Sequence, residues 1–347
     1  MGLVSSVSRR LMPFGLPLRV QFPPDHLLDS RPLEKLTVEQ LEARTHRLEK
    51  LENLYHKGHD LAWDGKKLLA QLVKKHGRIE LPQEKKEAIA NVFSVILWGE
   101  LAAWEVASFL AERIRDNSEA KMAATIQTFD EARHYYVMRD YLRLREIELP
   151  PPNAFVKSML VQLITTDSAL FKLIGMQLFV EHVAVHLFKA IADTHVEPVL
   201  SALMPYFGRD EARHVGLGKL YLPDVLSKIS RREAIELQAY QLWLMSFMQL
   251  SMELHRKDAD VLGIDLQASL RRAMREQSRM LDEIASHPRV RGLIVLPERL
   301  RFLNRWFIEN VWASGDGAQE GALTKPWMLG ARGTAVRVAV RAWGAIA

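Results

Sequence analysis

The sequence predicts an all-α chain whose core is a four-helix bundle carrying additional helices. Long stretches bounded by helix caps and breaks fill most of the chain after residue 34, and two of them are apolar nearly all round, as buried core helices are. Alternation of the strand type is confined to the short stretch 336–340. Long helices with two buried members favour a helical bundle over any fold that contains a sheet.

Composition divides the chain into three parts. Residues 1–33 contain five prolines and should form an extended N-terminal arm. Residues 34–313 should form the helical domain, and residues 314–347 a basic C-terminal tail. A chain of 347 residues is long enough for one large helical domain with appended segments.

Three long helices are expected in the first half of the helical domain. Thr37 and Gln40 form a capping box at the start of the first, and the pair Asn117-Ser118 separates the second from the third. Three consecutive prolines then mark a linker at residues 149–153. The expected helices span about residues 37–75, bent near Gly58 and Gly65, residues 82–116 and residues 118–146.

The second half of the helical domain repeats this pattern. Asp167 can cap a largely apolar helix that lasts to about residue 193. Another helix should begin near Pro198 and end at Pro223, because proline interrupts helical hydrogen bonding. The remaining expected helices cover residues 224–257, 264–286 and 294–313.

The composition excludes several classes of site. The chain has no cysteine, which excludes disulfide scaffolds, iron–sulfur clusters and thiolate zinc sites. A metal must therefore be held by His, Asp and Glu, which suit iron or manganese better than copper(I). Charged residues make up 26% and hydrophobic residues 48%, and no uncharged apolar run reaches membrane-spanning length, so we expect a cytoplasmic protein.

The net charge gives little information about binding partners. The formal net charge of +5 is modest for this length, and we expect no nucleic-acid partner. Basic residues gather at both ends of the chain, and near the C-terminus they are mixed with Trp327 and Trp343. These tails could contact an anionic membrane surface or a partner protein; a solvated tail with a docking segment is the alternative.

One pentapeptide carries the functional signal. Asp-Glu-Ala-Arg-His occurs twice and supplies Glu131 and Glu211. Each copy follows a glutamate that lies in an apolar helix: Glu100 precedes Glu131 by 31 positions, and Glu181 precedes Glu211 by 30. A single buried glutamate is more often an ion-pair partner than a metal ligand, but two copies at matched spacing favour a metal site.

The spacing brings each pair of glutamates to the same height. From Glu100 to the break at Asp116 the helix rises roughly 24 Å, and the return from Glu119 to Glu131 covers roughly 18 Å, at 1.5 Å per residue. The second pair is related in the same way. Because Glu and His at positions i and i+3 project from one helix face, the predicted ligand set is Glu100, Glu131, His134, Glu181, Glu211 and His214.

Energetics favour metal at such a cluster. Carboxylates buried among apolar helices cost several kcal/mol each unless they are paired, coordinated or protonated. Two divalent cations would balance four glutamates and leave both histidines neutral. Flanking aspartates can accept the second ring N–H of a ligating histidine and arginines can hold those aspartates, a supporting role predicted for Asp130, Arg133, Asp210 and Arg213.

Other polar residues near these glutamates have alternative roles. His182 and His186 are spaced to bind a metal by themselves, but they lie roughly 100° and 140° around the helix from the adjacent ligand, so we interpret them as packing or hydrogen-bonding residues. Gln127, Gln177 and Thr128 lie one turn before a predicted ligand. They could line a cavity or simply pack between helices.

This doubled motif resembles the ferritin-like, oxygen-activating di-iron carboxylate proteins. These include the bacterial multicomponent monooxygenase hydroxylases, the acyl-carrier-protein desaturases, the ribonucleotide reductase small subunit and the p-aminobenzoate N-oxygenase family. The resemblance covers roughly residues 85–220. It implies two iron ions, with an iron–manganese pair as an alternative, dioxygen as co-substrate, and Glu131 or Glu181 as the bridging ligand.

Two departures narrow the resemblance. The reductase subunit carries a radical tyrosine one turn after its first ligating histidine, where this chain has Met138. The N-oxygenases carry an extra histidine ligand one turn before the second-repeat glutamate, where this chain has Phe207. The sequence therefore predicts a six-ligand centre of oxygenase type.

The expected function is oxidation of a small, largely apolar organic substrate by hydroxylation, N-oxygenation or desaturation. A reductase or ferredoxin must supply electrons, because the chain has neither a nucleotide-binding glycine motif nor cysteines. The chain could form a homodimer. The alternative is a ferritin-like iron-binding or ferroxidase protein without an organic substrate. Candidate pocket residues, which core packing would also explain, are Phe93, Ile96, Ala103, Trp104, Ala107, Leu178, Ala184 and Phe207.

Overall fold

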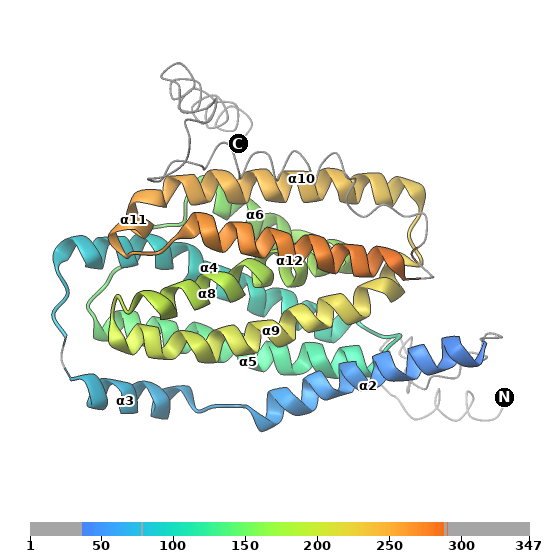
Figure 1. The fold of residues 1–347 in the computed structure, drawn as a ribbon, viewed down its shortest axis with the longest axis horizontal. Helices are drawn as coiled ribbons and strands as arrows, with labels where there is room; N and C mark the ends of the chain where they lie inside the picture. Colours follow the sequence, from blue (N-terminus) through green and yellow to red (C-terminus); the bar gives the residue numbers. More distant parts are fainter. Residues whose placement is uncertain (1–36, 78, 288–289, 291–347) are drawn as a thin grey trace, which may run out of the picture.

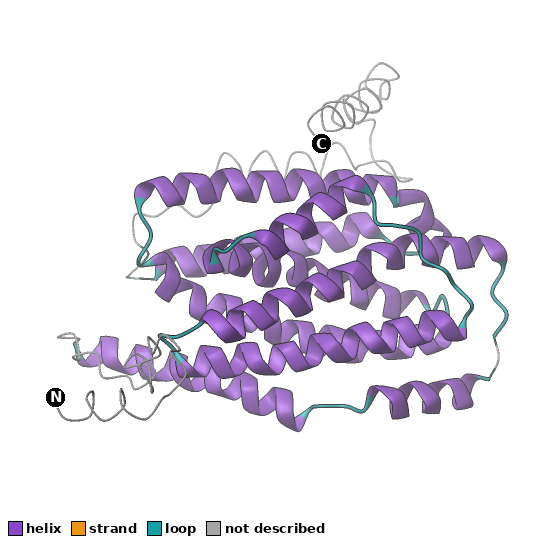
Figure 2. Cartoon of the chain, turned by 180° about the vertical axis from the view of Figure 1, so that it is seen from behind, coloured by secondary structure: helices purple, strands orange, loops and turns teal. Residues whose placement is uncertain are grey.

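The computed structural model describes residues 37–77, 79–287 and 290. This part of the chain consists of helices joined by loops and contains no strand, which confirms the all-α prediction (Figures 1 and 2). The expected N-terminal arm, the helix at 294–313 and the basic tail at 314–347 lie outside the described residues. The division of the chain into three parts stays a prediction.

Two antiparallel helical hairpins form the central bundle. The first pairs α4 (Gln83–Arg113) with α5 (Ser118–Leu144). The second pairs a continuous helical segment, η1 (Leu173–Val180) followed by α8 (Glu181–Thr194), with α9 (Pro198–Leu226). The hairpins pack together through α5 and α9, as expected of a four-helix bundle (Figure 1).

Additional helices cover both sides of the bundle. On one side, α2 (Val38–Asp60) and α3 (Gly65–His76) pack on α5 and α9. On the other side, α12 (Leu266–Ser286) packs on α8, and α10 (Arg231–Leu254) packs on α6 (Ala154–Thr165). The short helices α7 (Ala169–Lys172) and α11 (Arg256–Val261) complete the described part of the fold.

Side-chain caps set several helix boundaries. The Asn117 side chain accepts a hydrogen bond from the backbone N–H of Ala120 at 2.8 Å, so α5 begins where the sequence indicated. Ser230 and Glu233 form a reciprocal capping box at the start of α10. The helix expected over residues 224–257 is therefore divided, since α9 takes its first residues and α11 forms separately near its end.

Other predicted boundaries were wrong. The helix expected over residues 37–75 is two helices, because Asp64 caps α3 by accepting from the backbone of Lys67. Ser168, not Asp167, caps α7. Pro223 lies inside α9, which continues to Leu226.

One helix was missed between the linker and the second hairpin. Asn153 ends the proline run and accepts hydrogen bonds from the N–H groups of Phe155 and Val156, which starts α6. The segment is apolar and short, so its sequence pattern does not separate a helix from a connecting loop.

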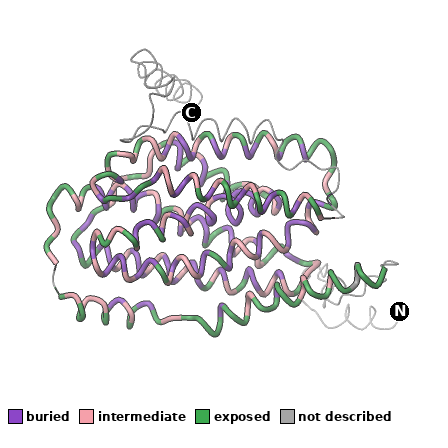
Figure 3. The backbone as a smooth tube through the Cα atoms, viewed as in Figure 1, coloured by how far each residue is buried: buried purple, intermediate pink, exposed green. Residues whose placement is uncertain are grey.

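The apolar core is divided into two clusters by a polar layer. One cluster includes Val106 and Leu217, and the other includes Phe93 and Tyr141. Along each helix the predicted ligands lie between members of the two clusters, and they are buried. Figure 3 shows that buried residues are concentrated in the central helices. Close-packed apolar layers on both sides limit access of water to the polar layer.

Two described helical segments are apolar and long enough to cross a membrane, Gln83–Arg113 and Ala169–Thr194. Their apolar windows are 50% and 72% buried inside the structure. Both segments are core members of the bundle, and burial accounts for their apolar character.

The π-helix η1 depends on a close approach by α9. A Cβ atom at Gly218 would lie 2.7 Å from Cβ of Gln177 and 2.9 Å from Cδ2 of Leu178. Gly218 therefore lets α9 pack directly on the π-helical turns that precede Glu181. Such π-helical turns are often found at functional sites.

Gly218→Ala should lower the free energy of unfolding by about 1–3 kcal/mol, because the added methyl group overpacks the contact with η1. Denaturant unfolding of the metal-free protein measures this change. Gly99→Ala is the matched control, since nothing lies within 4 Å of its Cβ position. The control should leave stability unchanged or raise it by up to about 1 kcal/mol through helix propensity. Equal stability of the two variants would contradict the packing argument.

Candidate metal centre

The structure brings all six predicted ligands together in the middle of the bundle. One side chain comes from α4, two from α5, one from α8 and two from α9. None of the six is more than 5% exposed. The full set is Glu100, Glu131, His134, Glu181, Glu211 and His214.

These six side chains form two overlapping groups of four. One donor atom from each member lies within 4.8 Å of the others in its group. Glu131 and Glu211 belong to both groups, whereas Glu100 and Glu181 each belong to one. Of the two residues proposed as a bridge, Glu131 belongs to both groups and Glu181 to one, which favours Glu131.

Both histidines turn the same ring nitrogen toward the carboxylates. Nδ1 of His134 lies 3.2 Å from Glu100 and 3.1 Å from Glu211. Nδ1 of His214 lies 3.0 Å from Glu131 and 2.9 Å from Glu211. In both rings Nδ1 is therefore the donor atom available to a metal.

Several buried atoms at this centre have no hydrogen-bond partner in the part of the chain that the structure describes. They are Oε2 of Glu100, Oε2 of Glu131 and Nδ1 of His134. Buried polar atoms of this kind cost free energy unless they bind something. Carboxylate oxygens and imidazole nitrogens are suitable ligands for iron and manganese, so the residues present fit a pair of such ions.

Without metal, the carboxylates ionise unequally. Burial raises the pKa of Glu100 to about 8, and burial together with the charges of Glu131 and Glu211 raises the pKa of Glu181 well above its usual value. Burial also opposes ionisation of Glu131 and Glu211, but the neighbouring histidines outweigh it and lower both pKa values. Four carboxylates cannot all be charged here without compensating cations.

A crossed network of aspartates and arginines supports the two histidines. Nε2 of His134 lies 3.3 Å from Asp210, and Nε2 of His214 lies 3.3 Å from Asp130, so each aspartate contacts the histidine of the other repeat. Arg133 and Arg213 each contact both aspartates, and every one of these four residues is buried.

This network fixes the direction of the rings. A carboxylate only accepts hydrogen bonds, so each Nε2 carries a proton, and each Nδ1, once deprotonated, would offer its electron pair to a metal ion. Burial opposes ionisation of Asp210 and Asp130, but the contacts with His134 and His214 and, after them, the charged arginines lower both pKa values below the usual range. Both aspartates are therefore charged acceptors.

Aromatic rings close one side of the centre. Phe207 is fully buried and stacks on His134 with ring centroids 4.5 Å apart. Trp63, in the connection between α2 and α3, donates from Nε1 to Asp210 at 2.7 Å and lies under the guanidinium of Arg133. Sequence reasoning missed Trp63, because an isolated tryptophan in a loop carries no signal for such a contact.

The glutamines near the centre form a polar chain. Nε2 of Gln127 lies 3.1 Å from both Glu131 and Glu181, and Gln177 donates to Gln127 at 3.3 Å. Thr128 instead donates to the backbone oxygen of Ala124 on its own helix. Of the three polar residues weighed from the sequence, the two glutamines reach the centre and Thr128 does not.

The chain matches the model of a known protein family. The family model of the p-aminobenzoate N-oxygenase AurF matches residues 73–293, which is more than half of the chain and includes all six residues. The chain belongs to this family. Membership makes the protein an oxygen-dependent di-iron oxidoreductase and confirms the predicted class. No curated protein matches the chain.

Solved structures support the same fold. A variant of an R2-like ligand-binding oxidase with an aerobically reconstituted Mn/Fe cofactor aligns with a TM-score of 0.52 at 17% identity, covering 66% of this chain and 92% of that one. Another variant with an Fe/Fe cofactor aligns with a TM-score of 0.50 at 17% identity over 66% and 92% of the two chains. The ferritin-like helical fold is thereby confirmed.

In this member of the N-oxygenase family, an apolar cleft reaches the metal centre. It has a volume of about 110 Å³ and lies mainly between α4 and α8, with Glu100 and Glu181 in its lining. Of the pocket residues expected from the sequence, only Ile96, Ala103 and Ala184 line it. The remaining expected residues pack elsewhere: Phe93, Ala107, Leu178 and Phe207 are buried core residues, and Trp104 is 36% exposed.

Proposed function

We propose that the six clustered residues bind two iron ions, or an iron–manganese pair, and that this centre uses dioxygen to oxidise a small, neutral, apolar organic molecule. The observation that carries the proposal is the apolar cleft that ends on Glu100 and Glu181. In this arrangement a bound substrate would lie directly beside two ligands, one from each metal group.

The lining of the cleft supports a neutral substrate. Among the described residues, its polar contributions come from the two glutamates, Ser251 and His255, and neither lysine nor arginine lines it. Burial lowers the pKa of His255, so this ring is neutral near pH 7. A carboxylate substrate would therefore enter the cleft without a counter-charge, at a cost of several kcal/mol.

The size of the cleft supports a substrate of about one ring. An apolar protein cavity of about 150 Å³ is large enough to bind benzene, and the cleft is of similar volume. Its walls are mostly aliphatic, with Val92, Ile96, Val183 and Leu187 among them. Such a surface selects by shape and apolar area rather than by hydrogen bonds.

A cleft beside the metals also disfavours the alternative of a ferroxidase without an organic substrate, which would need no such space. Electrons for turnover would come from a reductase or ferredoxin. The cytoplasmic location and a homodimeric state stay predictions.

Aniline and p-aminobenzoate test the proposed substrate class, since they share a ring and differ by a carboxylate. In the iron-loaded, reduced protein exposed to oxygen, aniline and toluene should be oxidised, and p-aminobenzoate should react at least about tenfold more slowly. Product analysis by chromatography and mass spectrometry measures this. Preferred turnover of p-aminobenzoate would contradict a neutral substrate, and oxygen uptake without any organic product across neutral and anionic rings would favour the ferroxidase alternative.

Ala103→Leu should fill part of the cleft and lower kcat/KM for the accepted ring by about 10–200-fold, the range for one misfitted hydrophobic group. Iron content should stay at two ions per chain, because Ala103 is not among the six clustered residues. Ala154→Leu, at an exposed position at the start of α6, is the matched control. Unchanged kinetics in Ala103→Leu would show that substrates do not use this cleft.

A further inference from the structure

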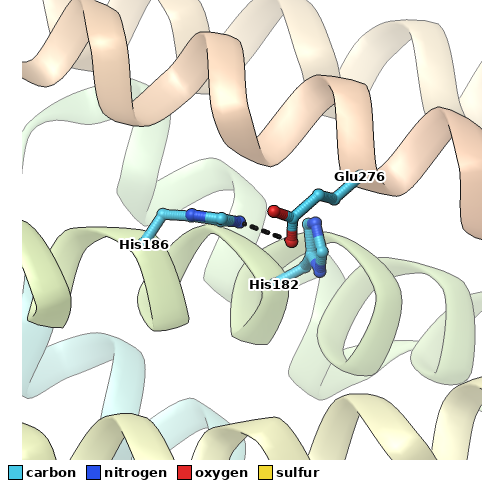
Figure 4. Close-up of side chains that lie close together, drawn as sticks. All are labelled: His182, His186 and Glu276. Atoms are coloured by element: carbon cyan, nitrogen blue, oxygen red, sulfur yellow. Dashed lines mark ion pairs between the residues drawn. The ribbon is translucent and has the colours of Figure 1, made fainter.

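A second group of metal-binding side chains lies between α8 and α12, apart from the candidate metal centre. His182 and His186 come from α8, and Glu276 comes from α12 (Figure 4). One donor atom of each lies within 4.8 Å of donor atoms of the other two. None of these residues belongs to the two groups that form the candidate metal centre.

His186 has a buried ring nitrogen that is not satisfied. Its Nε2 lies 3.2 Å from Oε2 of Glu276, yet among the described residues it meets no partner with hydrogen-bond geometry. Burial lowers the pKa of His186, against the opposing effect of the Glu276 carboxylate, and this favours the neutral ring that a metal ligand requires. A neutral imidazole nitrogen that faces a carboxylate can bind a cation placed between them when the ring proton is on the other nitrogen.

His182 is oriented by a backbone contact with the opposite helix. Its Nε2 lies 2.9 Å from the carbonyl oxygen of Ala273 on α12. A carbonyl only accepts, so Nε2 donates and Nδ1 keeps its electron pair. Histidines that bind metals are commonly held by such a hydrogen bond from the second ring nitrogen.

We propose that His182, His186 and Glu276 bind a divalent transition-metal ion, with Zn²⁺ as the best fit, and that this ion clamps α12 onto α8. Two imidazoles and one carboxylate are a common zinc donor set, whereas Ca²⁺ and Mg²⁺ prefer oxygen ligands. The Glu276 side chain is 55% exposed, so the ion would reach solvent and could complete its coordination with water.

The clamp would act on the helix that carries a ligand of the main centre. His182 directly follows Glu181 at the start of α8. On α12, Gln277 donates to the backbone oxygen of Leu178 in η1 at 2.9 Å, one turn after the contact between Ala273 and His182. Ala273 and Gln277, one helical turn apart on α12, therefore each bind the η1–α8 segment by a hydrogen bond. A bound ion would add a third contact between the two helices.

Zinc binding to the iron-loaded protein tests this site. The iron-loaded chain is dialysed against Zn²⁺, and metal analysis counts zinc and iron separately. The native protein should retain two iron ions and bind one further zinc ion, and His186→Gln and Glu276→Gln should each weaken zinc binding at least about tenfold. Glu283→Gln, an exposed glutamate on the same helix, is the matched control and should bind zinc as the native protein does.

A thermal measurement adds a second criterion that does not depend on zinc counting. Zinc should raise the midpoint of thermal unfolding of the iron-loaded native protein and of Glu283→Gln, because it binds only the folded state. His186→Gln and Glu276→Gln should not respond. The proposal would be overturned if the native protein binds no zinc beyond its iron, or if these two variants bind zinc as tightly as the native protein.

Discussion

Glu131→Ala should reduce the iron content of the protein from two ions per chain to less than one, and lower oxygen-dependent turnover by at least about 10³-fold. Glu131 is fully buried and belongs to both groups of four donor atoms, so its loss removes a ligand from each metal position. The neighbouring Gln127 is a neutral amide and could not replace the lost charge. Metal analysis and steady-state oxygen consumption measure the two effects.

Two further variants separate loss of a ligand from loss of the fold. Glu131→Gln keeps the shape of the side chain and should lose iron nearly as completely, since a neutral amide does not balance the metal charge. Glu105→Ala, an exposed position on α4, should keep both iron ions. Retention of two iron ions by Glu131→Ala would refute the assignment of this residue as a ligand.

Repetition made the centre predictable from the sequence. The same five-residue motif follows a buried glutamate twice at nearly equal distance, and helix geometry turns that spacing into proximity. The structure brings the six residues together as the spacing requires. The central helices were also predicted from the sequence, because the long apolar segments that carry Glu100 and Glu181 leave few alternatives to a buried helix.

Contacts between hairpins could not be predicted in this way. The crossing of Asp130 to His214 and of Asp210 to His134 depends on how the two hairpins face each other, which no local pattern encodes. Trp63 reaches Asp210 across 147 residues of sequence. The sequence also gave no indication that Glu276 lies beside His186, because α12 contributes only one side chain to that group.

Two of the helix boundaries that were predicted wrongly have local physical causes. Ser168 and Asp167 are both capable N-caps, and the sequence does not distinguish them. Pro223 was expected to end a helix, but it lies near the C-terminal end of α9, and the helix continues only to Leu226 beyond it.

The metal-free protein should lose stability as pH rises from about 5 to about 8. Burial raises the pKa of Glu100 to about 8, and that of Glu181 is also well above its usual value. Burial opposes protonation of the two histidines, but hydrogen bonds to carboxylates raise the pKa of His134 well above 6.5, and the charges of neighbouring glutamates together with hydrogen bonds do the same for His214. As pH rises through this window, the unfolded chain releases protons from these groups that the folded chain keeps.

The sign of the effect follows from this difference in bound protons. Stability falls with pH wherever the unfolded state binds fewer protons than the folded state. Glu131 and Glu211, with lowered pKa values, are already ionised in both states above about pH 5 and add no slope. One unit of pKa shift corresponds to about 1.4 kcal/mol, so the combined loss in free energy of unfolding should be on the order of several kcal/mol.

Bound metal ions should oppose this loss of stability as pH rises. Bound ions require deprotonated ligands, and metal affinity therefore rises with pH. The difference in free energy of unfolding between the iron-loaded and metal-free forms should thus widen as pH increases, as measured by denaturant titration at pH 5, 6.5 and 8. Glu100→Gln removes one of the titrating groups and should flatten the slope of the metal-free protein. A metal-free protein whose stability rises with pH over this window would show that charge repulsion among these carboxylates is not what the metal ions relieve.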